Sequence, residues 1–311
     1  MTLAILCSGQ GRQHPDMLAL TADAPEAAGL FAHAAKLLGT DPRDFVRAET
    51  SESMHRNRAG QILCTVQALA AAAALRDAMP GRIVVAGYSV GEVAAWGVGG
   101  LFRATDTLDL VTRRAGAMDA ATQPGEGLMF VRGLPRGDID RLCERYAAEV
   151  AIVNPGDAFV LGGNRTALRA IADEAHATNI ARVVDLPVEV ASHTSRLVAA
   201  SATFRESLRS IPMRFPPAAG TRILSGVDGA PVISADAGLD KLAAQISQTL
   251  QWASCLQGCI EAGATAFLEL GPGHALSGMV ASAWPDVPTR SVEDFRTLQG
   301  VRAWLQRHAG R

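Results

Sequence analysis

A serine stands between two glycines at residues 87–91, where the chain reads Gly-Tyr-Ser-Val-Gly. An apolar run at 82–87 precedes Ser89 and a helix-like segment begins at Val90, so the sequence predicts a tight turn from a strand into a helix. Flanking glycines relieve the crowding of such a turn, which presents the hydroxyl as a nucleophile. An ordinary turn serine is the alternative, because 30 of the 311 residues are glycine. The strand and the helix favour the nucleophile.

An attacking serine needs a base within hydrogen-bond reach. Among the seven histidines, His193 lies in the stretch PVEVASHTSRL. This stretch follows the segment 125–187, whose predicted order of strands and helices differs from that of the rest of the chain. Clefts between such parts are frequent positions for sites. His274, in the loop after ELGPG, is the second candidate. We predict that His193 is the base, with His274 as the alternative.

The oxyanion that forms during attack on a carbonyl needs N–H donors. The first apolar run, 3–7, leads into Ser-Gly-Gln-Gly-Arg-Gln at 8–13. A glycine-rich loop at the end of a strand exposes backbone N–H groups to a ligand. An ordinary glycine turn explains the same residues. The residue after the serine, Val90, is predicted to supply a further N–H.

Strand-like and helix-like segments alternate along most of the chain, which is typical of an α/β fold with a parallel sheet. The segment 125–187 has a different order of strand, helix, two strands, helix and strand, which indicates the split ferredoxin-like unit. We therefore predict a large α/β domain formed by 1–124 and 188–311, with a ferredoxin-like subdomain inserted at 125–187. Within the later part, 239–252 is predicted as one helix.

The charge balance and the cysteines limit the partners and the compartment. With 29 Lys and Arg against 31 Asp and Glu, the net charge of −2 gives no case for nucleic acid or an anionic membrane as partner. The five cysteines are scattered and the N-terminus lacks the pattern of an export signal, so we expect reduced thiols and a cytoplasmic location. Cys255 and Cys259 share a predicted helix, but no His or second Cys pair completes a metal site, and none is predicted.

Six stretches, in order along nearly the whole chain, resemble the malonyl-CoA:acyl-carrier-protein transacylase family. The resemblance implies an α/β-hydrolase-like large domain with a ferredoxin-like insert, a nucleophile at Ser89 and a histidine base at His193. It also implies that N–H groups of Gln10 and Val90 hold the oxyanion. The stretches are SGQGRQ at 8–13, GYSVGE at 87–92, the arginine pair at 113–114, ASHTSRL at 191–197, LQW at 250–252 and ELGPGHAL at 269–276.

The same resemblance implies the substrate and further site residues. In this family a backbone carbonyl orients the histidine, and the LQW stretch implies that Gln251 supplies it. The arginine of the family falls on Arg114, whose planar guanidinium can pair with the free carboxylate of a malonyl group, and Arg113 is its solvated neighbour. A looser match places Gln61 near the pocket. Malonyl-CoA is then the substrate, a phosphopantetheine-type thiol on an acyl-carrier protein is the acceptor, and no permanently bound cofactor is expected.

Departures from the usual family sequence indicate a particular subgroup of the family. Tyr88 stands where the family usually has a histidine before the serine, and 194–197 differs from the usual sequence after the base. Together with LCSGQGRQH and GYSVGEVAAWGVGGL, the chain is similar to the epsilon subunit of biotin-independent malonate decarboxylase. That subunit loads malonyl onto the CoA-derived group of a small carrier subunit, so other decarboxylase subunits are expected partners. A transacylase of fatty-acid or polyketide synthesis is the alternative.

Two other classes of function compete with a transferase. A thioester hydrolase with the same turn uses an acid that follows the serine, and Asp157 and Asp185 stand in the required order. A non-catalytic subunit that docks a carrier keeps the fold without chemistry at Ser89. Four arginines are candidates for CoA phosphates or an acidic carrier, although each also fits an ordinary surface charge: Arg12, Arg56, Arg58 and Arg196.

Overall fold

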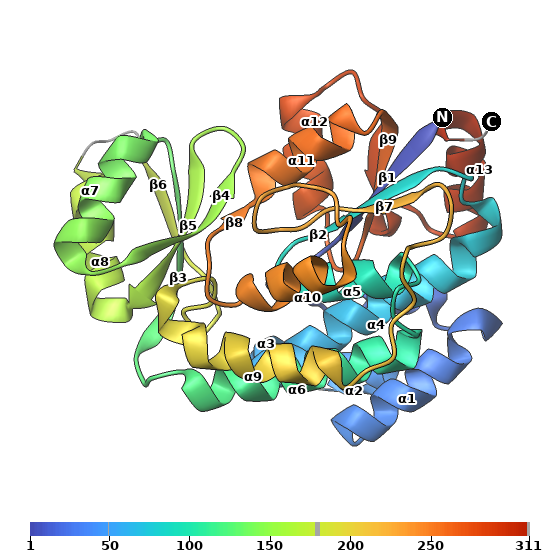
Figure 1. Ribbon diagram of the computed structural model, residues 1–311, viewed down its shortest axis with the longest axis horizontal. Helices are drawn as coiled ribbons and strands as arrows, with labels where there is room; N and C mark the ends of the chain where they lie inside the picture. Colours follow the sequence, from blue (N-terminus) through green and yellow to red (C-terminus); the bar gives the residue numbers. More distant parts are fainter. Residues whose placement is uncertain (49, 178–180, 310–311) are drawn as a thin grey trace.

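The structure is a computed structural model that describes residues 1–48, 50–177 and 181–309. Two sheets organise it (Figure 1). The larger sheet has the strand order β10-β9-β1-β2-β7, and every neighbouring pair is parallel. This confirms the predicted α/β class with a parallel sheet. The strands are β1 (Thr2–Cys7), β2 (Ile83–Gly87), β7 (Thr221–Ile223), β9 (Ala264–Leu270) and β10 (Thr289–Ser291).

Helices cover both faces of the large sheet and one face of the small sheet (Figure 1). In the first part of the chain they are α1 (Ala28–Leu38), α2 (Pro42–Ala48), α3 (Ser51–His55), α4 (Asn57–Leu75), α5 (Val90–Val98) and α6 (Ala104–Ala121). The small sheet carries α7 (Arg136–Tyr146) and α8 (Arg165–His176). The remaining helices are α9 (Val198–Arg209), α10 (Ala235–Ala244), α11 (Trp252–Glu261), α12 (Ala275–Ala283) and α13 (Leu298–His308). Short 3-10 turns are η1 (Ala19–Thr21), η2 (Pro25–Ala27), η3 (Arg76–Ala78), η4 (Ser195–Leu197) and η5 (Val292–Asp294).

The central strand β1 is apolar along its whole length because both of its faces are covered. Leu3 and Ile5 belong to an apolar core shared with α4, α5 and α6. Ala4 and Leu6 point the other way, into a second core shared with α11 and α12. A parallel sheet that is buried on both sides requires such continuous apolar runs, which is why the sequence shows no polar alternation there.

The smaller sheet is built mainly from residues 126–185, where the elements run β3, α7, β4, β5, α8 and β6. This is the order predicted for the ferredoxin-like unit, and the strand order is β6-β3-β5-β4-β8. We keep the boundaries at 124/125 and 187/188 as a proposed division of the chain. The strands are β3 (Glu126–Arg132), β4 (Glu149–Asn154), β5 (Ala158–Asn164), β6 (Arg182–Asp185) and β8 (Leu250–Gln251).

Strand β8 links the two parts of the molecule and corrects one prediction. The residues 239–252 do not form one helix, because α10 ends at Ala244 and β8 pairs in parallel with β4 at Ile152 and Val153. A new helix, α11, begins only at Trp252. The prediction was wrong because pairing with a distant strand, which local periodicity does not reveal, outweighs the helical pattern of this segment.

Helix α4 lies inside the protein and carries several polar side chains toward the site. Within the described residues, 57–78 is the helical segment long and apolar enough to span a membrane, and 83% of its most apolar window is buried. Its apolar face belongs to the core between the large sheet and α6. We therefore interpret α4 as a core helix.

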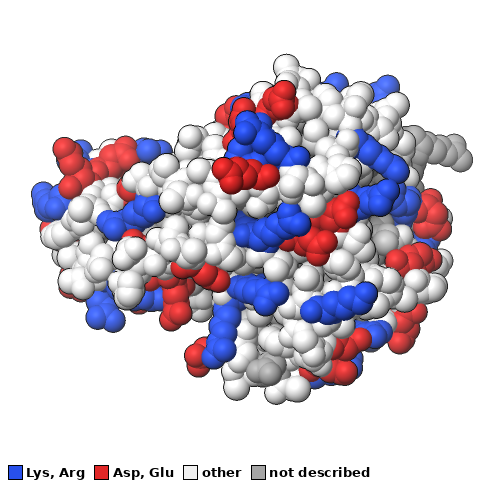
Figure 2. Space-filling model, turned by 60° about the horizontal axis from the view of Figure 1, so that its bottom comes forward, with Lys and Arg blue, Asp and Glu red and all other residues white. Residues whose placement is uncertain are grey.

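Charges of both signs are distributed over the surface. On the face shown in Figure 2, Lys and Arg side chains lie among Asp and Glu side chains. One ion pair on the surface joins Arg205 on α9 to Asp240 on α10. This mixture agrees with the nearly balanced composition.

Candidate active site

Ser89 lies on a tight turn between β2 and α5, as the sequence predicts. Its backbone angles, φ 57° and ψ −120°, are in a region that non-glycine residues rarely adopt. A Cβ on Gly87 would come within 2.0 Å of the Gly91 carbonyl oxygen, and a Cβ on Gly91 within 2.1 Å of the Cys7 carbonyl oxygen. Both flanking positions therefore require glycine, which makes the glycine pattern a geometric necessity of this turn.

His193 lies beside Ser89 and is almost completely buried. Its Nε2 is 2.8 Å from Ser89 Oγ, and its Nδ1 is 2.5 Å from the backbone carbonyl oxygen of Gln245. Because a carbonyl can only accept, Nδ1 carries the proton and Nε2 is left to accept the hydrogen bond from the serine hydroxyl. This is the arrangement that a general base for Ser89 requires.

The carbonyl that orients His193 is that of Gln245, so the expectation for Gln251 is wrong. Gln251 lies in β8, where its N–H donates to the Gly226 carbonyl over 2.8 Å. The expectation rested on matching the LQW stretch to the family pattern, and that match selects a glutamine in β8. Gln245 is the residue directly after α10, and its carbonyl is free to meet the imidazole.

Burial keeps the imidazole of His193 neutral. The pKa of His193 is lowered to about 3, first by burial and then by the positive charge of Arg114, against the opposing effect of the Gln245 carbonyl. A neutral imidazole is the form that accepts a proton. The base is therefore ready at neutral pH without an acidic partner.

Arg114 on α6 is fully buried beside this pair. Its Nη1 donates to Gln61 Oε1 over 2.8 Å and its Nη2 to Gln245 Oε1 over 3.3 Å, while Nε has no partner among the described residues. Burial lowers the pKa of Arg114 to about 10, and the charge of Glu92 opposes that shift. Arg114 stays a cation at neutral pH, and a buried cation with neutral partners is a site for an anion.

Gln245 connects all three groups and was not predicted from the sequence. Besides its carbonyl contact with His193, its side-chain Nε2 donates to the Ser89 carbonyl over 3.1 Å, and its Oε1 accepts from Arg114. The residue is fully buried. A polar residue in the run AAQIS was the only signal in the sequence, and it does not indicate contacts with residues so distant in the chain.

The glycine-rich loop after β1 packs against the serine turn. A Cβ on Gly9 would come within 2.7 Å of the Tyr88 carbonyl oxygen, so the two loops touch through their backbones. Gln10 follows in this loop and Val90 is the first residue of α5. No hydrogen bond to a described residue occupies the N–H of either, which is what donors to an oxyanion need.

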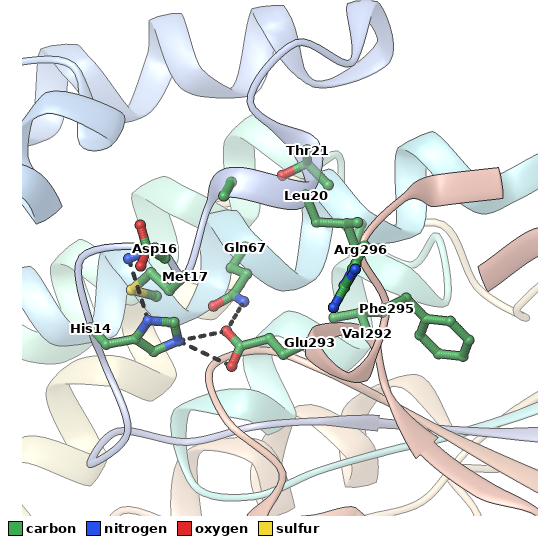
Figure 3. Close-up of a pocket in the computed structure, with 12 residues that line it drawn as sticks. His14, Asp16, Met17, Leu20, Thr21, Gln67, Val292, Glu293, Phe295 and Arg296 are labelled. Atoms are coloured by element: carbon green, nitrogen blue, oxygen red, sulfur yellow. Dashed lines mark hydrogen bonds and ion pairs between the residues drawn. The ribbon is translucent and has the colours of Figure 1, made fainter. Parts of the chain in front are cut away.

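The far end of the same loop is fixed by a half-buried carboxylate (Figure 3). Glu293 lies 3.0 Å from His14 Nε2 through each of its oxygens, and it also accepts from Gln67 Nε2 over 2.9 Å and from the Gly273 N–H over 2.7 Å. The group borders a cavity of about 360 Å³ that Phe295 also lines. Ser89, His193 and Arg114 do not line this cavity, so it is distinct from the candidate active site.

A cleft of about 880 Å³ between the two parts of the molecule reaches the oxyanion loop at Gln10. The large part contributes residues at the start of α4 and the end of α6, and the small part contributes Arg165. Of the candidate arginines, Arg56 and Arg58 line this cleft and Arg196 instead pairs with Glu126 at 3.2 Å. Arg12 is exposed near Gly273.

Other residues considered for the site lie elsewhere. Asp157 is in the turn between β4 and β5, and Asp185 ends the edge strand β6. His274 precedes α12, where its carbonyl accepts from that helix. Tyr88 packs edge-on against Trp252, with ring centroids 5.3 Å apart. Cys255 and Cys259 are buried free thiols, and no cluster that could hold a metal occurs in the described part of the chain.

Residues 5–284 match the acyl transferase domain family. The chain belongs to this family. A malonyl CoA-acyl carrier protein transacylase of Mycobacterium tuberculosis is 31% identical over 296 residues, which cover 94% of this chain and 96% of the relative. The matched span of this acyl transferase includes Ser89, Arg114, His193 and Gln245.

Solved structures of similar proteins share the fold of this acyl transferase. The MCAT structure from Mycobacterium tuberculosis superposes with a TM-score of 0.88 at 30% identity, over 97% of this chain and all of the other. A second structure holds a type II PKS acyl-carrier protein in complex with its malonyl-transacylase, with a TM-score of 0.89, 26% identity and coverage of 97% and 99%. The two-sheet architecture is therefore that of the family.

Proposed function

We propose that this chain is a malonyl-CoA:acyl-carrier-protein S-malonyltransferase that works through an ester on Ser89. The observation that carries the proposal is the buried guanidinium of Arg114, which Gln245 ties to the Ser89 and His193 pair. A malonyl group brings a free carboxylate that can pair with this cation, whereas an acetyl group has none. The names of the similar proteins support the same substrate and acceptor.

The first half of the reaction forms the ester. Ser89 Oγ attacks the thioester carbonyl carbon while His193 Nε2 takes the hydroxyl proton, and the N–H groups of Gln10 and Val90 hold the oxyanion. The carbon–sulfur bond then breaks. The proton passes from His193 to the departing sulfur, so free CoA leaves and malonyl stays on the serine oxygen.

The second half repeats these steps with a carrier thiol. The thiol gives its proton to His193 and attacks the ester carbonyl, and the carbon–oxygen bond to Ser89 breaks. The serine oxygen recovers the proton from His193, which restores the starting state. The same base and the same oxyanion donors serve both halves, giving ping-pong kinetics.

The structure offers specific arguments against a simple hydrolase. The partner of His193 Nδ1 is a backbone carbonyl, and neither Asp157 nor Asp185 occupies that position. A generic esterase also has no need for a buried cation beside its serine. A non-catalytic docking role is disfavoured because the serine and imidazole stand at hydrogen-bond distance.

For the carrier, we propose the small subunit of malonate decarboxylase, with this chain as the epsilon subunit and other decarboxylase subunits as partners. The proposal is supported by Tyr88 and by the stretches LCSGQGRQH and GYSVGEVAAWGVGGL. The acyl carrier of fatty-acid or polyketide synthesis is the second candidate, favoured by the similarity to transacylases of that kind. We also propose a cytoplasmic location, in keeping with five buried free thiols.

The intact mass of the protein after brief mixing with malonyl-CoA tests the proposal. We expect a malonyl adduct on the unmodified protein, a much smaller acetyl adduct with acetyl-CoA, and none on Ser89→Ala. Release of CoA without an adduct would favour the hydrolase, and neither event would favour the docking subunit. Adding each purified holo-carrier to the malonyl enzyme then identifies the acceptor by which carrier gains the malonyl mass.

A further inference from the structure

A line of hydrogen bonds runs from the buried Arg114 to the rim of the cleft. Arg114 Nη1 donates to Gln61 Oε1 over 2.8 Å, and Gln61 Nε2 donates to Asn57 Oδ1 over 2.7 Å. Asn57 Nδ2 in turn donates to Asp119 Oδ1 over 2.8 Å. Gln61 is fully buried, whereas Asn57 and Asp119 line the cleft. The line therefore joins the buried Arg114 to the cleft.

The residues at the two ends of this line determine which atom of each amide donates and which accepts. A guanidinium can only donate and a carboxylate can only accept, so each amide between them has one possible orientation. Gln61 must turn its oxygen to Arg114, and Asn57 must turn its nitrogen to Asp119. Without the Asn57 acceptor, which Asp119 holds in place, the Gln61 nitrogen keeps only the weak contact with Met118 Sδ at 3.5 Å, so the amide is less firmly held with its oxygen on Arg114.

Additional contacts tie the line to both catalytic elements. Asn57 Nδ2 also reaches the Ala115 carbonyl at 3.3 Å, on the same helix as Arg114. The backbone carbonyl of Asn57 accepts from Gln10 Nε2 at 3.3 Å, on the oxyanion loop. Asn57 is thus placed between the anion site and the oxyanion donors, at the first position of α4.

We propose that Asn57 and Asp119 are positioning residues that set the preference for acyl groups with a free carboxylate. They act through Gln61, whose oxygen holds Arg114 in the orientation that meets the substrate carboxylate. This inference rests on the proposed malonyl transfer. It concerns selectivity and not the ester chemistry, because neither residue contacts Ser89 or His193 in the structure.

The first test compares malonyl and acetyl loading in single and double variants. We expect Asn57→Ala to lower the ratio of malonyl to acetyl acylation rates by roughly tenfold, the effect of one hydrogen bond near a charged group. Asp119→Ala should give a smaller loss, and the double variant should fall no further than Asn57→Ala alone. Arg113→Ala is the matched control, since Arg113 is an exposed cation on the same helix that bonds to Ser210.

The second test uses pH and distinguishes positioning from a general structural defect. In Asn57→Asp the new carboxylate can still accept from Gln61, but it repels Asp119 until the two share a proton at low pH, so residue 57 keeps its place on the line only there. We expect the malonyl preference of this variant to recover as the pH falls from about 8 to 5, while that of Asn57→Ala stays low throughout. A general unfolding of the start of α4 gives no such recovery.

The outcomes separate this inference from the proposed function. If the unmodified protein forms no malonyl adduct on Ser89, both are overturned. If it forms the adduct but Asn57→Ala keeps the native malonyl preference, only the inference is overturned. The same holds if Asn57→Asp shows no dependence on pH.

Discussion

Arg114 contributes mainly to selectivity, because its hydrogen bonds reach Ser89 and His193 only through Gln245. We predict that Arg114→Ala lowers kcat/KM for malonyl-CoA by about 10- to 100-fold, the range for hydrogen bonds to a charged group, and leaves acetyl-CoA nearly unchanged. Steady-state kinetics with both thioesters checks this. An equal fall for the two substrates would show that the residue maintains the site as a whole.

His193 determines how the acylation rate depends on pH. Its pKa is lowered to about 3 by burial and by Arg114, so the neutral form persists far below the ordinary range of histidine, near 6.5. We predict that kcat/KM for acylation stays flat as the pH falls from about 7 to 5, where an ordinary histidine is already protonated. The rate of adduct formation with acetyl-CoA, followed by mass spectrometry, measures this. In Arg114→Ala the acid limb should move to higher pH, because a positive charge is removed.

A catalytic residue could be predicted from the sequence where its backbone geometry requires particular residue types beside it in the chain. Ser89 is an example, since its two glycines avoid backbone contacts of 2.0 and 2.1 Å. Gln245 was missed because its three partners lie far away in the chain, and no local signal marks such a contact. The assignment of Gln251 came from the resemblance of LQW to the family pattern, and such a short match does not show which carbonyl meets the imidazole.

At the scale of elements, α4 and the loop after β1 are held together by Glu293. Its carboxylate receives His14 from the loop, Gln67 from α4 and the N–H of Gly273 (Figure 3). We predict that Glu293→Gln costs about 2 kcal/mol, since hydrogen bonds to a charged acceptor are lost. The melting temperature should fall by about 3 °C.

The same variant should slow acylation, because the loop that carries Gln10 loses its anchor at His14. We expect a lower rate with malonyl-CoA and acetyl-CoA alike, in contrast to the selective loss in Arg114→Ala. Calorimetry and single-turnover acylation measure the two effects. Arg296→Ala, which removes an exposed side chain at the rim of the same cavity, is the control. A native melting temperature in Glu293→Gln would contradict the anchoring role.

Element types followed from periodicity wherever an element is long and its environment uniform. The buried runs at β1 and β2 and the order of elements in 126–185 were predicted, because a covered parallel sheet and a half-covered small sheet leave distinct patterns. Strand β8 was not, since two residues show no period. Its existence depends on the exposed edge of β4 and not on its own sequence.

At the scale of the whole molecule, the small sheet packs against the segment that carries His193. Gly162 on β5 faces this segment, and a Cβ there would come within 2.6 Å of Thr194 Cγ2. Thr194 is buried and its hydroxyl is bonded to the Ala191 carbonyl, so it has little room to move. The position of the imidazole thus depends on packing between the two parts and not on the large sheet alone.

We predict that Gly162→Ala lowers the rate of Ser89 acylation several-fold, because overpacking of about 1 to 3 kcal/mol displaces Thr194 and with it His193. Gly163→Ala is the matched control, since the neighbouring residue of a strand faces the opposite side, where its Cβ would meet Ala148 at 3.3 Å and the Ala147 carbonyl oxygen at 3.8 Å and not the His193 segment. Both variants add the same methyl group to the same strand. If the packing positions the base, Gly162→Ala should lose acylation with any thioester while Gly163→Ala retains it. Equal rates in single-turnover acylation would show that the small sheet does not hold the histidine in place.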